Sequence, residues 1–166
     1  EVLARLVAGD IRKFQVTIPE GFNLSEIATR LAKTEVGSVE DFLALCHDPE
    51  FIKALDVEAD SLEGYLFPET YTYTSSTTPR QLLRSMVAQL DEHLSPSILA
   101  SAEALGMNRH ELLTLASIIQ KEAGNVMEMP LISAVFNNRL KRNIALQADP
   151  TVIYGIEAFD GNLTRK

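Results

Sequence analysis

Small polar residues stand directly before proline at four places in this chain of 166 residues: Asp48-Pro49, Thr78-Pro79, Ser95-Pro96 and Asp149-Pro150. At a helix N-terminus such a side chain accepts hydrogen bonds from free backbone amides. Proline fits the next position because the N–H group that it lacks would have no partner there. We therefore expect helices over about 79–94 and 96–105, the second closed by Gly106, and short helices after Asp48 and after Asp149, where the aspartates act as N-caps.

Other helix starts follow a different pattern, in which a capping residue is followed three positions later by an acidic residue. The pattern occurs at Asn23, Ser38 and Asn108, and Pro130 begins a further apolar-periodic segment. The helices predicted from these signals cover Leu24–Lys33, Val39–Cys46, about 109–123 before Gly124, and Pro130 to about Arg142, and the apolar spacing of Val2–Val7 before Gly9 predicts one more.

Strand signals are few. Lys13–Ile18 alternates polar and apolar residues, which predicts a half-buried strand that ends at Pro19-Glu20-Gly21. The stretch 64–78 is rich in Tyr and Thr and is predicted as loop with a short strand. No internal repeat or long linker interrupts the pattern. The predicted fold class is therefore α+β and helix-dominated, with two or three short strands.

Charge and cysteine content narrow the classes of function. The chain has 15 Lys and Arg against 23 Asp and Glu, a net charge of −8, so no basic field attracts a phosphate backbone and we expect no nucleic-acid partner. The single cysteine, Cys46, cannot form an internal disulfide and is expected to be a small buried apolar residue. The longest dense apolar run, Leu112–Ile119, is far shorter than the roughly 20 residues of a membrane span. Because the chain starts and stops abruptly, we interpret it as part of a longer protein.

Metal and cofactor motifs are not recognisable. His47, His93 and His110 lie far apart, without partners at metal-ligand spacing, and the chain has no glycine-rich phosphate loop. We expect these histidines to face solvent or to cap helices, and we expect the protein to use no metal and no organic cofactor.

Three segments place polar groups where chemistry could occur. In 62–71, Glu63 and Glu69 lie among aromatic residues, where desolvation can raise a carboxyl pKa. On this pattern alone the better explanation is structural: the acids cap helices and accept bonds from backbone amides.

The second segment is the helix 112–122. Its expected core stripe is Leu112, Leu115, Ile118 and Ile119, and the small residues Ala116 and Ser117 leave space beside Gln120. Gln120 could therefore lie at the floor of a cleft, although a glutamine beside small residues is ordinary in a helix. In the third segment, 146–155, Gln147 and Asp149 either bind sugar hydroxyls, with Asn137, Asn138 and Arg139 as further donors, or serve only as caps and solvated groups. The residues alone leave both explanations open.

Four segments, in this order, resemble the endolytic murein transglycosylases of bacteria, the MltG or YceG-like family. They are L-E-G-Y-L-F-P-E-T-Y at 62–71, A-S-I-I-Q-K-E at 116–122, S-A-V-F-N-N-R-L at 133–140 and L-Q-A-D-P-T-V-I-Y-G at 146–155. The likeness covers about Phe14–Arg165. The resemblance implies two domains: residues 1–20 as the C-terminal part of a LysM-like subdomain, and 21–166 as a mostly helical catalytic domain that we expect to be incomplete at its C-terminus.

The resemblance also implies a function. Members of this family are held in the cytoplasmic membrane by one N-terminal helix, and their catalytic domain faces the periplasm or cell wall. They cut nascent peptidoglycan strands internally, between N-acetylmuramic acid and N-acetylglucosamine, and leave a 1,6-anhydro-muramic acid end. Peptidoglycan glycan strands are the expected partners, with cell-wall elongation enzymes as further ones. Substrate-binding or supporting roles are implied for Glu63, Tyr65, Glu69, Ser117, Asn138, Gln147, Asp149, Thr151 and Tyr154.

One residue departs from the family pattern. The family's catalytic residue is a glutamate in Ser-Ile-Ile-Glu-Lys-Glu, and this chain has Gln120 at that position. The change is nearly isosteric, but an amide cannot deliver a proton as a carboxylic acid does. We therefore expect an inactive form that keeps its fold and binding site, and we expect Gln120 to lie within two helical turns, roughly 11 Å, of Glu69 and Gln147. The alternatives are a non-catalytic peptidoglycan-binding module and a scaffold for cell-wall synthesis enzymes.

Overall fold

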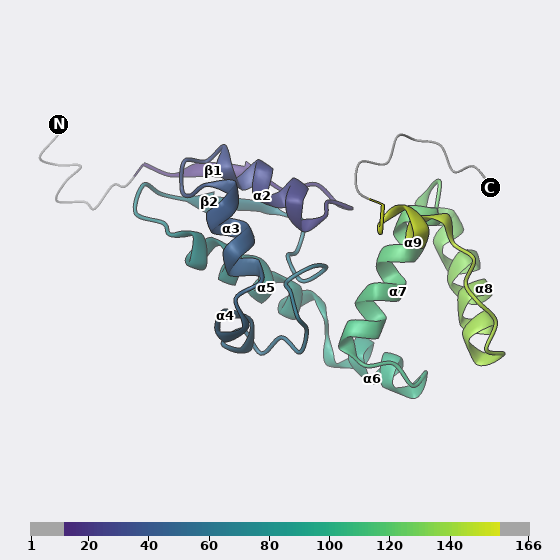
Figure 1. Ribbon diagram of the computed structural model, residues 1–166. Coiled ribbons are helices and arrows are strands. Elements are labelled where there is room, and N and C mark those ends of the chain that lie inside the picture. Colours follow the sequence, from purple (N-terminus) through teal and green to yellow (C-terminus); the bar gives the residue numbers. More distant parts are fainter. Residues whose placement is uncertain (1–11, 157–166) are drawn as a thin grey trace, which may run out of the picture. The chain divides into compact units, whose positions relative to one another are not determined.

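The computed structural model describes residues 12–156, so the helix expected over Val2–Val7 lies outside the described residues. The chain divides into two compact units, Glu1–His110 and Glu111–Lys166 (Figure 1). Helix α7, Arg109–Glu122, begins in the first unit and continues in the second.

The first unit is built on a two-stranded antiparallel sheet. Strand β1, Phe14–Thr17, pairs with β2, Thr70–Tyr73, so that Phe14 lies opposite Tyr73 and Val16 opposite Tyr71. Both strands fall where the sequence predicts them. Because β1 pairs with a strand more than fifty residues later, β1 is an integral part of this unit. The domain boundary expected at residue 20 stays a prediction.

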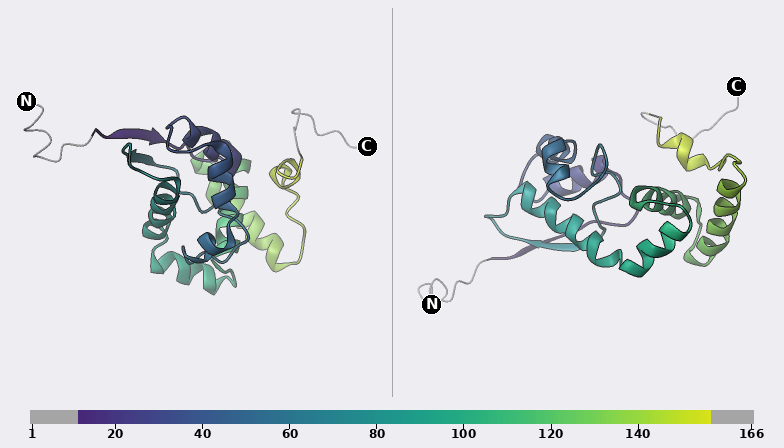
Figure 2. Two further views of the ribbon diagram at one scale, coloured as in Figure 1. Left: turned by 60° about the vertical axis from the view of Figure 1, so that its left-hand side comes forward. Right: turned by 90° about the horizontal axis from the view of Figure 1, so that it is seen from below.

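Helices make up the rest of the first unit. They are α2 (Leu24–Ala32), α3 (Val39–Cys46), α4 (Pro49–Lys53), α5 (Pro79–His93) and α6 (Pro96–Ala104). Helix α2 packs on α3, and α5 contacts both α3 and β2 (Figures 1 and 2). The fold is thus helix-dominated α+β, as predicted.

Capping explains where these helices begin. The side chains of Asn23, Ser38 and Thr78 each accept a bond from the third helical amide, and the residue at that position bonds back to the cap. Asp48 and Ser95 cap the helices that start with Pro49 and Pro96. Each helix therefore starts where its local sequence satisfies the free amides of the first turn.

The hydrophobic core of the first unit is continuous over its helices and loops. Its fully buried side chains include Leu31 on α2, Phe42 on α3 and Leu83 on α5. Phe51 on α4 and Leu62 in the loop before β2 are also fully buried. Apolar residues of each helix that lie at spacings of three and four therefore meet in one core.

The second unit contains the rest of α7, the 3-10 turn η1 (Val126–Glu128), α8 (Met129–Lys141) and α9 (Asp149–Ile153). Among its described residues the buried side chains are Leu115, Phe136 and Ala148. The stripe expected on α7 is therefore only partly correct, because Leu115 is buried but Leu112, Ile118 and Ile119 are half-buried.

The start of α9 corrects a predicted cap. Asp149 is the first residue of the helix, and the N-cap position belongs to Ala148, whose side chain makes no capping bond. The Asp149 carboxylate still lies in the first turn, where negative charge is favourable.

Among residues 12–156 no helix is long and apolar enough to cross a membrane.

Candidate active site

The Glu63 carboxylate accepts a hydrogen bond from a backbone amide in the structure. Its Oε2 accepts a hydrogen bond from the amide of Leu24, the first residue of α2, at 3.0 Å. The next loop residue, Gly64, has φ +79°, which lets the chain turn back directly after this contact. The carboxylate thereby satisfies a free amide and places negative charge at the positive end of the helix. This contact favours the structural explanation of Glu63 over acid–base chemistry.

The Glu69 carboxylate, unlike that of Glu63, bonds the amide of its own neighbour in sequence. It is exposed, and its Oε1 accepts a bond from the amide of the next residue, Thr70, at 2.7 Å. No second element is held by that bond. Glu69 therefore remains free to meet a solvent-borne ligand, whereas Glu63 does not.

The contrast between the two acids gives a stability prediction. Glu63→Ala is expected to lower the free energy of unfolding by about 1 kcal/mol, because α2 loses a capping acceptor. Glu63→Gln keeps an acceptor oxygen and is expected to lose less than half of that. Glu69→Ala, the control, should change stability by less than about 0.5 kcal/mol. Urea denaturation measures all three, and equal effects of Glu63→Ala and Glu69→Ala would contradict the capping role.

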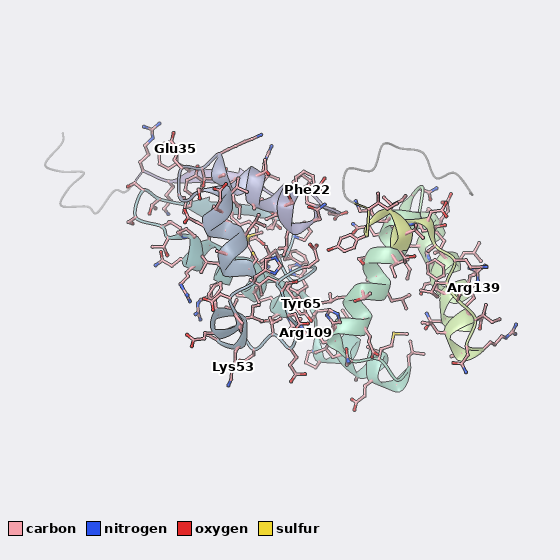
Figure 3. All side chains as sticks on the ribbon, in the orientation of Figure 1. Phe22, Glu35, Lys53, Tyr65, Arg109 and Arg139 are labelled. Carbon is pink, nitrogen blue, oxygen red and sulfur yellow. The ribbon has the colours of Figure 1, made fainter. Side chains whose placement is uncertain are left out.

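The tyrosines of the 62–71 segment are buried and bonded. The Tyr71 hydroxyl donates to the carbonyl oxygen of Phe67 at 2.6 Å, and burial raises the pKa of Tyr71. Tyr65, labelled in Figure 3, is 1% exposed. Its hydroxyl lies 3.1 Å from Nδ1 of His110. Burial also raises the pKa of Tyr65. Such deep burial favours a supporting role for Tyr65 over contact with a polymeric substrate.

Gln120 lies in the last turn of α7 and is half-buried. One turn earlier, the Ser117 hydroxyl donates to the carbonyl of Thr114 at 2.8 Å, so it stays on its own helix. The neighbours Lys121 and Glu122 are exposed. A glutamate at position 120 would thus have apolar neighbours in Ile118 and Ile119 along the chain and partial access to solvent.

The segment before α9 has an unusual backbone. Gln147 has φ +52°, in the left-handed region, and its side chain is exposed. The Arg139 guanidinium of α8 donates to the carbonyl of Leu146, the preceding residue (Figure 3). Because this bond ties the loop to α8, Arg139 orients the chain on which Gln147 and Asp149 stand. The motif at 133–140 includes Arg139, but sequence spacing alone does not show that its partner is a backbone carbonyl.

The other residues of this region are open to ligand. Asn138 and Asp149 are exposed, and Tyr154 is 69% exposed. Thr151 uses its hydroxyl locally, donating to the carbonyl of Ala148 at 2.7 Å. The second unit thus holds Gln120, Ser117, Asn138, Gln147, Asp149, Thr151 and Tyr154, while Glu63, Tyr65 and Glu69 belong to the first. The expectation that Gln120 lies near both Glu69 and Gln147 stays a prediction.

All three histidines are exposed, as predicted. His47 is exposed at the end of α3, and Nδ1 of His93 is bonded to the Gln89 carbonyl at 2.8 Å while its ring stacks on Phe67. Within residues 12–156 no group of three His, Cys, Asp or Glu side chains could hold a metal ion. His110 contacts Tyr65, a pairing that sequence spacing could not indicate.

Cys46 is buried at the end of α3, as predicted. Burial, with a smaller contribution from the negative charge of Glu63, raises the pKa of its thiol to about 12.

In the folded chain at pH 8 we therefore expect Cys46 to react with a thiol reagent about 10³-fold more slowly than in the unfolded chain. Because the folded pKa is raised, folding should also lose stability as pH rises from about 9 towards 12. Equal labelling rates with and without denaturant would contradict this.

Comparison with known proteins gives a family match for the whole chain. The model of the YceG-like family matches residues 1–166. The endolytic murein transglycosylase of Streptococcus pneumoniae serotype 2 (strain D39) is 35% identical over 169 residues, which cover 90% of this chain and 30% of that protein. The endolytic murein transglycosylase of Bacillus subtilis (strain 168) is 33% identical over 156 residues, covering 85% of this chain and 43% of that protein.

A solved structure of a YceG-like protein also matches nearly the whole chain. A crystal structure of a YceG-like protein from Listeria monocytogenes matches with a TM-score of 0.81 and 31% identity, over 98% of this chain and 59% of that one. The chain thus spans less than half the length of the curated relatives and more than half of the solved one. With a family match over every residue and relatives above 30% identity, this chain belongs to the YceG-like family.

Proposed function

We propose that the protein containing this chain is an endolytic murein transglycosylase, which cuts nascent peptidoglycan strands between N-acetylmuramic acid and N-acetylglucosamine and so ends strand elongation. The observation that carries the proposal is the whole-chain family match, together with relatives of that name that cover 85–90% of the chain. The product proposed for the muramic acid end is the 1,6-anhydro form.

The chemistry assigned to position 120 needs a carboxylic acid. In its neutral form a glutamic acid there gives its proton to the glycosidic oxygen as the bond from that oxygen to C1 of the muramic acid breaks. The resulting carboxylate then takes the proton of the 6-hydroxyl, whose oxygen closes on C1. The charges and atoms balance without water, so no second carboxylate is needed to activate it.

Gln120 cannot perform either proton transfer. Its side chain keeps the size of glutamate and one acceptor oxygen, so the site can still hold a glycan strand. We assign this chain as an inactive form of the enzyme. Glu69, Asn138, Gln147, Asp149 and Tyr154 are proposed to contact the sugars because their side chains are exposed, while Glu63, Tyr65, Ser117 and Thr151 support the fold through the contacts described above.

The proposed peptidoglycan substrate indicates where the protein acts in the cell. We propose that the protein acts on the outer side of the cytoplasmic membrane, held there by one N-terminal helix, and that cell-wall elongation enzymes are its partners. The LysM-like character of residues 1–20 belongs to the same proposal. A peptidoglycan-binding module without catalysis is the competing function, and Gln120 is the residue that favours it.

The test compares the chain as it stands with its Gln120→Glu variant. Both are incubated with uncrosslinked peptidoglycan, and soluble fragments are analysed by mass spectrometry for anhydro-muramic acid ends. We expect such ends from the glutamate variant alone, with similar glycan retention by both, and no loss of activity on adding a chelator. If neither releases fragments but both retain glycan, the binding-module function is correct.

A further inference from the structure

A surface pocket lies at the end of β2, where the chain turns into α5 (Figure 1). Its volume is about 360 Å³, within the range of pockets that bind small molecules. Three parts of the backbone build it: the last residues of β2, the connecting loop and the first two turns of α5. All belong to the first unit. We call this site the hydroxyl pocket, and its polar lining consists of Thr72, Thr74, Ser76, Thr77, Gln81 and Ser85.

The hydroxyl pocket is polar but uncharged. Five of its polar side chains carry a hydroxyl and one carries an amide, and among the described residues no acidic or basic side chain lines it. The remaining lining residue, Leu82, is 2% exposed and gives the pocket an apolar part. An ion is poorly held there, because no opposite charge offsets its desolvation. A neutral ligand with several hydroxyl groups suits it, because hydroxyls on both sides can donate and accept. Sugar rings, with polar hydroxyls and apolar C–H edges, have this chemistry.

Local hydrogen bonds hold the loop side of the hydroxyl pocket. The Thr77 hydroxyl accepts from the amide of Thr74 at 2.9 Å, and the Thr74 hydroxyl lies 3.0 Å from that of Ser76. A loop that is already ordered loses little conformational entropy when a ligand binds to it. This side of the pocket is therefore formed before a ligand arrives.

The strand and the helix supply groups that remain able to bond a ligand. Oε1 of Gln81 accepts from the amide and the hydroxyl of Thr78 at 2.8 and 3.1 Å, which commits this oxygen to the helix cap. Within residues 12–156 the structure shows no partner for Nε2 of Gln81 or for the Thr72 hydroxyl. The Ser85 hydroxyl donates to the carbonyl of Leu82 at 2.7 Å and can still accept. The pocket thus offers both donors and acceptors.

We propose that the hydroxyl pocket is a carbohydrate-binding subsite of the first unit, which takes one uncharged sugar residue of a glycan strand, an inference that rests on the proposed function for the identity of the strand. In peptidoglycan the N-acetylmuramic acid residues carry a lactyl group to which the peptide is joined, whereas the N-acetylglucosamine residues carry neither. The uncharged pocket therefore suits N-acetylglucosamine. Because hydroxyl and amide groups do not titrate near neutral pH, the pocket adds affinity for the strand and takes no part in its cleavage.

An NMR titration of the chain as it stands tests the subsite without any cleavage. The probe is triacetylchitotriose, the uncharged and peptide-free trimer of N-acetylglucosamine. Backbone amide signals of residues 72–85 are expected to shift saturably, with a Kd on the order of 1 mM, as is usual for a small ligand held by a few groups. Shifts that do not saturate, or saturable shifts only in residues 111–156, would overturn the proposal.

Two variants test whether the pocket itself holds the sugar. Ser85→Leu fills the pocket from an exposed position of α5 and should abolish the shifts. Its matched control is Ser101→Leu, because Ser101 is also exposed on a helix and its hydroxyl also donates to a carbonyl of that helix, at 2.8 Å. The control should leave Kd within about twofold of its starting value.

Thr72→Val removes one hydroxyl and keeps a branched side chain that suits a strand. It should raise Kd about 3- to 10-fold, as expected for one lost hydrogen bond. Thr70→Val is the matched control, because Thr70 lies on the same face of β2 but does not line the pocket. The remaining amide signals of each variant show that it is folded. A Kd that changes in neither Ser85→Leu nor Thr72→Val would place the sugar elsewhere and overturn the proposal.

The subsite and the proposed function can fail separately. Release of anhydro ends by the Gln120→Glu variant tests the function and does not depend on the hydroxyl pocket. A chain that binds the trimer at residues 72–85 but gives no such release keeps the subsite and loses the enzymatic function. A chain that gives the release but binds no trimer there keeps the function and loses the subsite.

Discussion

Gln120→Glu is expected to raise the rate of glycan cleavage about 10²- to 10⁴-fold over the chain as it stands, the usual contribution of a positioned general acid or base. The increase should lie towards the upper end because one group serves first as acid and then as base. The substitution exchanges an amide for a carboxyl of nearly the same size at a half-buried position, so the fold should not change. The measured quantity is the initial rate of release of anhydro-ended fragments.

The matched control for this experiment is Gln15→Glu. Gln15 is exposed on β1, so the control adds the same negative charge far along the chain from position 120. It should release no more fragments than the starting chain. Equal turnover by the starting chain and its Gln120→Glu variant would show that residue 120 is not the acid, and Glu69 would become the first carboxylate to substitute.

Phe42→Ala is expected to lower the free energy of unfolding of the first unit by about 3–5 kcal/mol. Phe42 is 0% exposed on α3, the helix on which α2 packs, and removing a buried phenyl ring loses burial energy and leaves a cavity. Such a loss is a large part of the about 5–15 kcal/mol that stabilises an ordinary domain. The variant should therefore be partly unfolded at modest urea concentrations.

Tyrosine fluorescence can follow this transition. The chain has no tryptophan, and Tyr65 and Tyr71 are buried in the same unit as Phe42. Leu105→Ala is the control, because Leu105 is 50% exposed and its truncation should change stability by less than about 0.5 kcal/mol. A loss below about 1 kcal/mol for Phe42→Ala would mean that the α2–α3 contact does not hold the unit together.

The sequence by itself determined the positions of most helices, because their starts depend on local chemistry. Asn23, Ser38 and Thr78 cap helices in the structure through amides only three residues away, so no distant contact is needed to predict them. The exception is α9, where Asp149 enters the first turn and Ala148 takes the cap position. The family was also readable from the sequence, since four long motifs in order are specific without any knowledge of distances.

Only the tertiary structure shows which contacts the residues of those motifs make. Glu63 and Glu69 stand in one loop with similar neighbours, but only Glu63 faces the free amide of Leu24, 39 residues away in sequence. The burial of Tyr65 and its contacts with Arg109 and His110 likewise join residues that are far apart in sequence. Capping is a property of a few adjacent residues, whereas burial and partner choice arise when distant segments pack together, and the pattern within one segment does not contain that information.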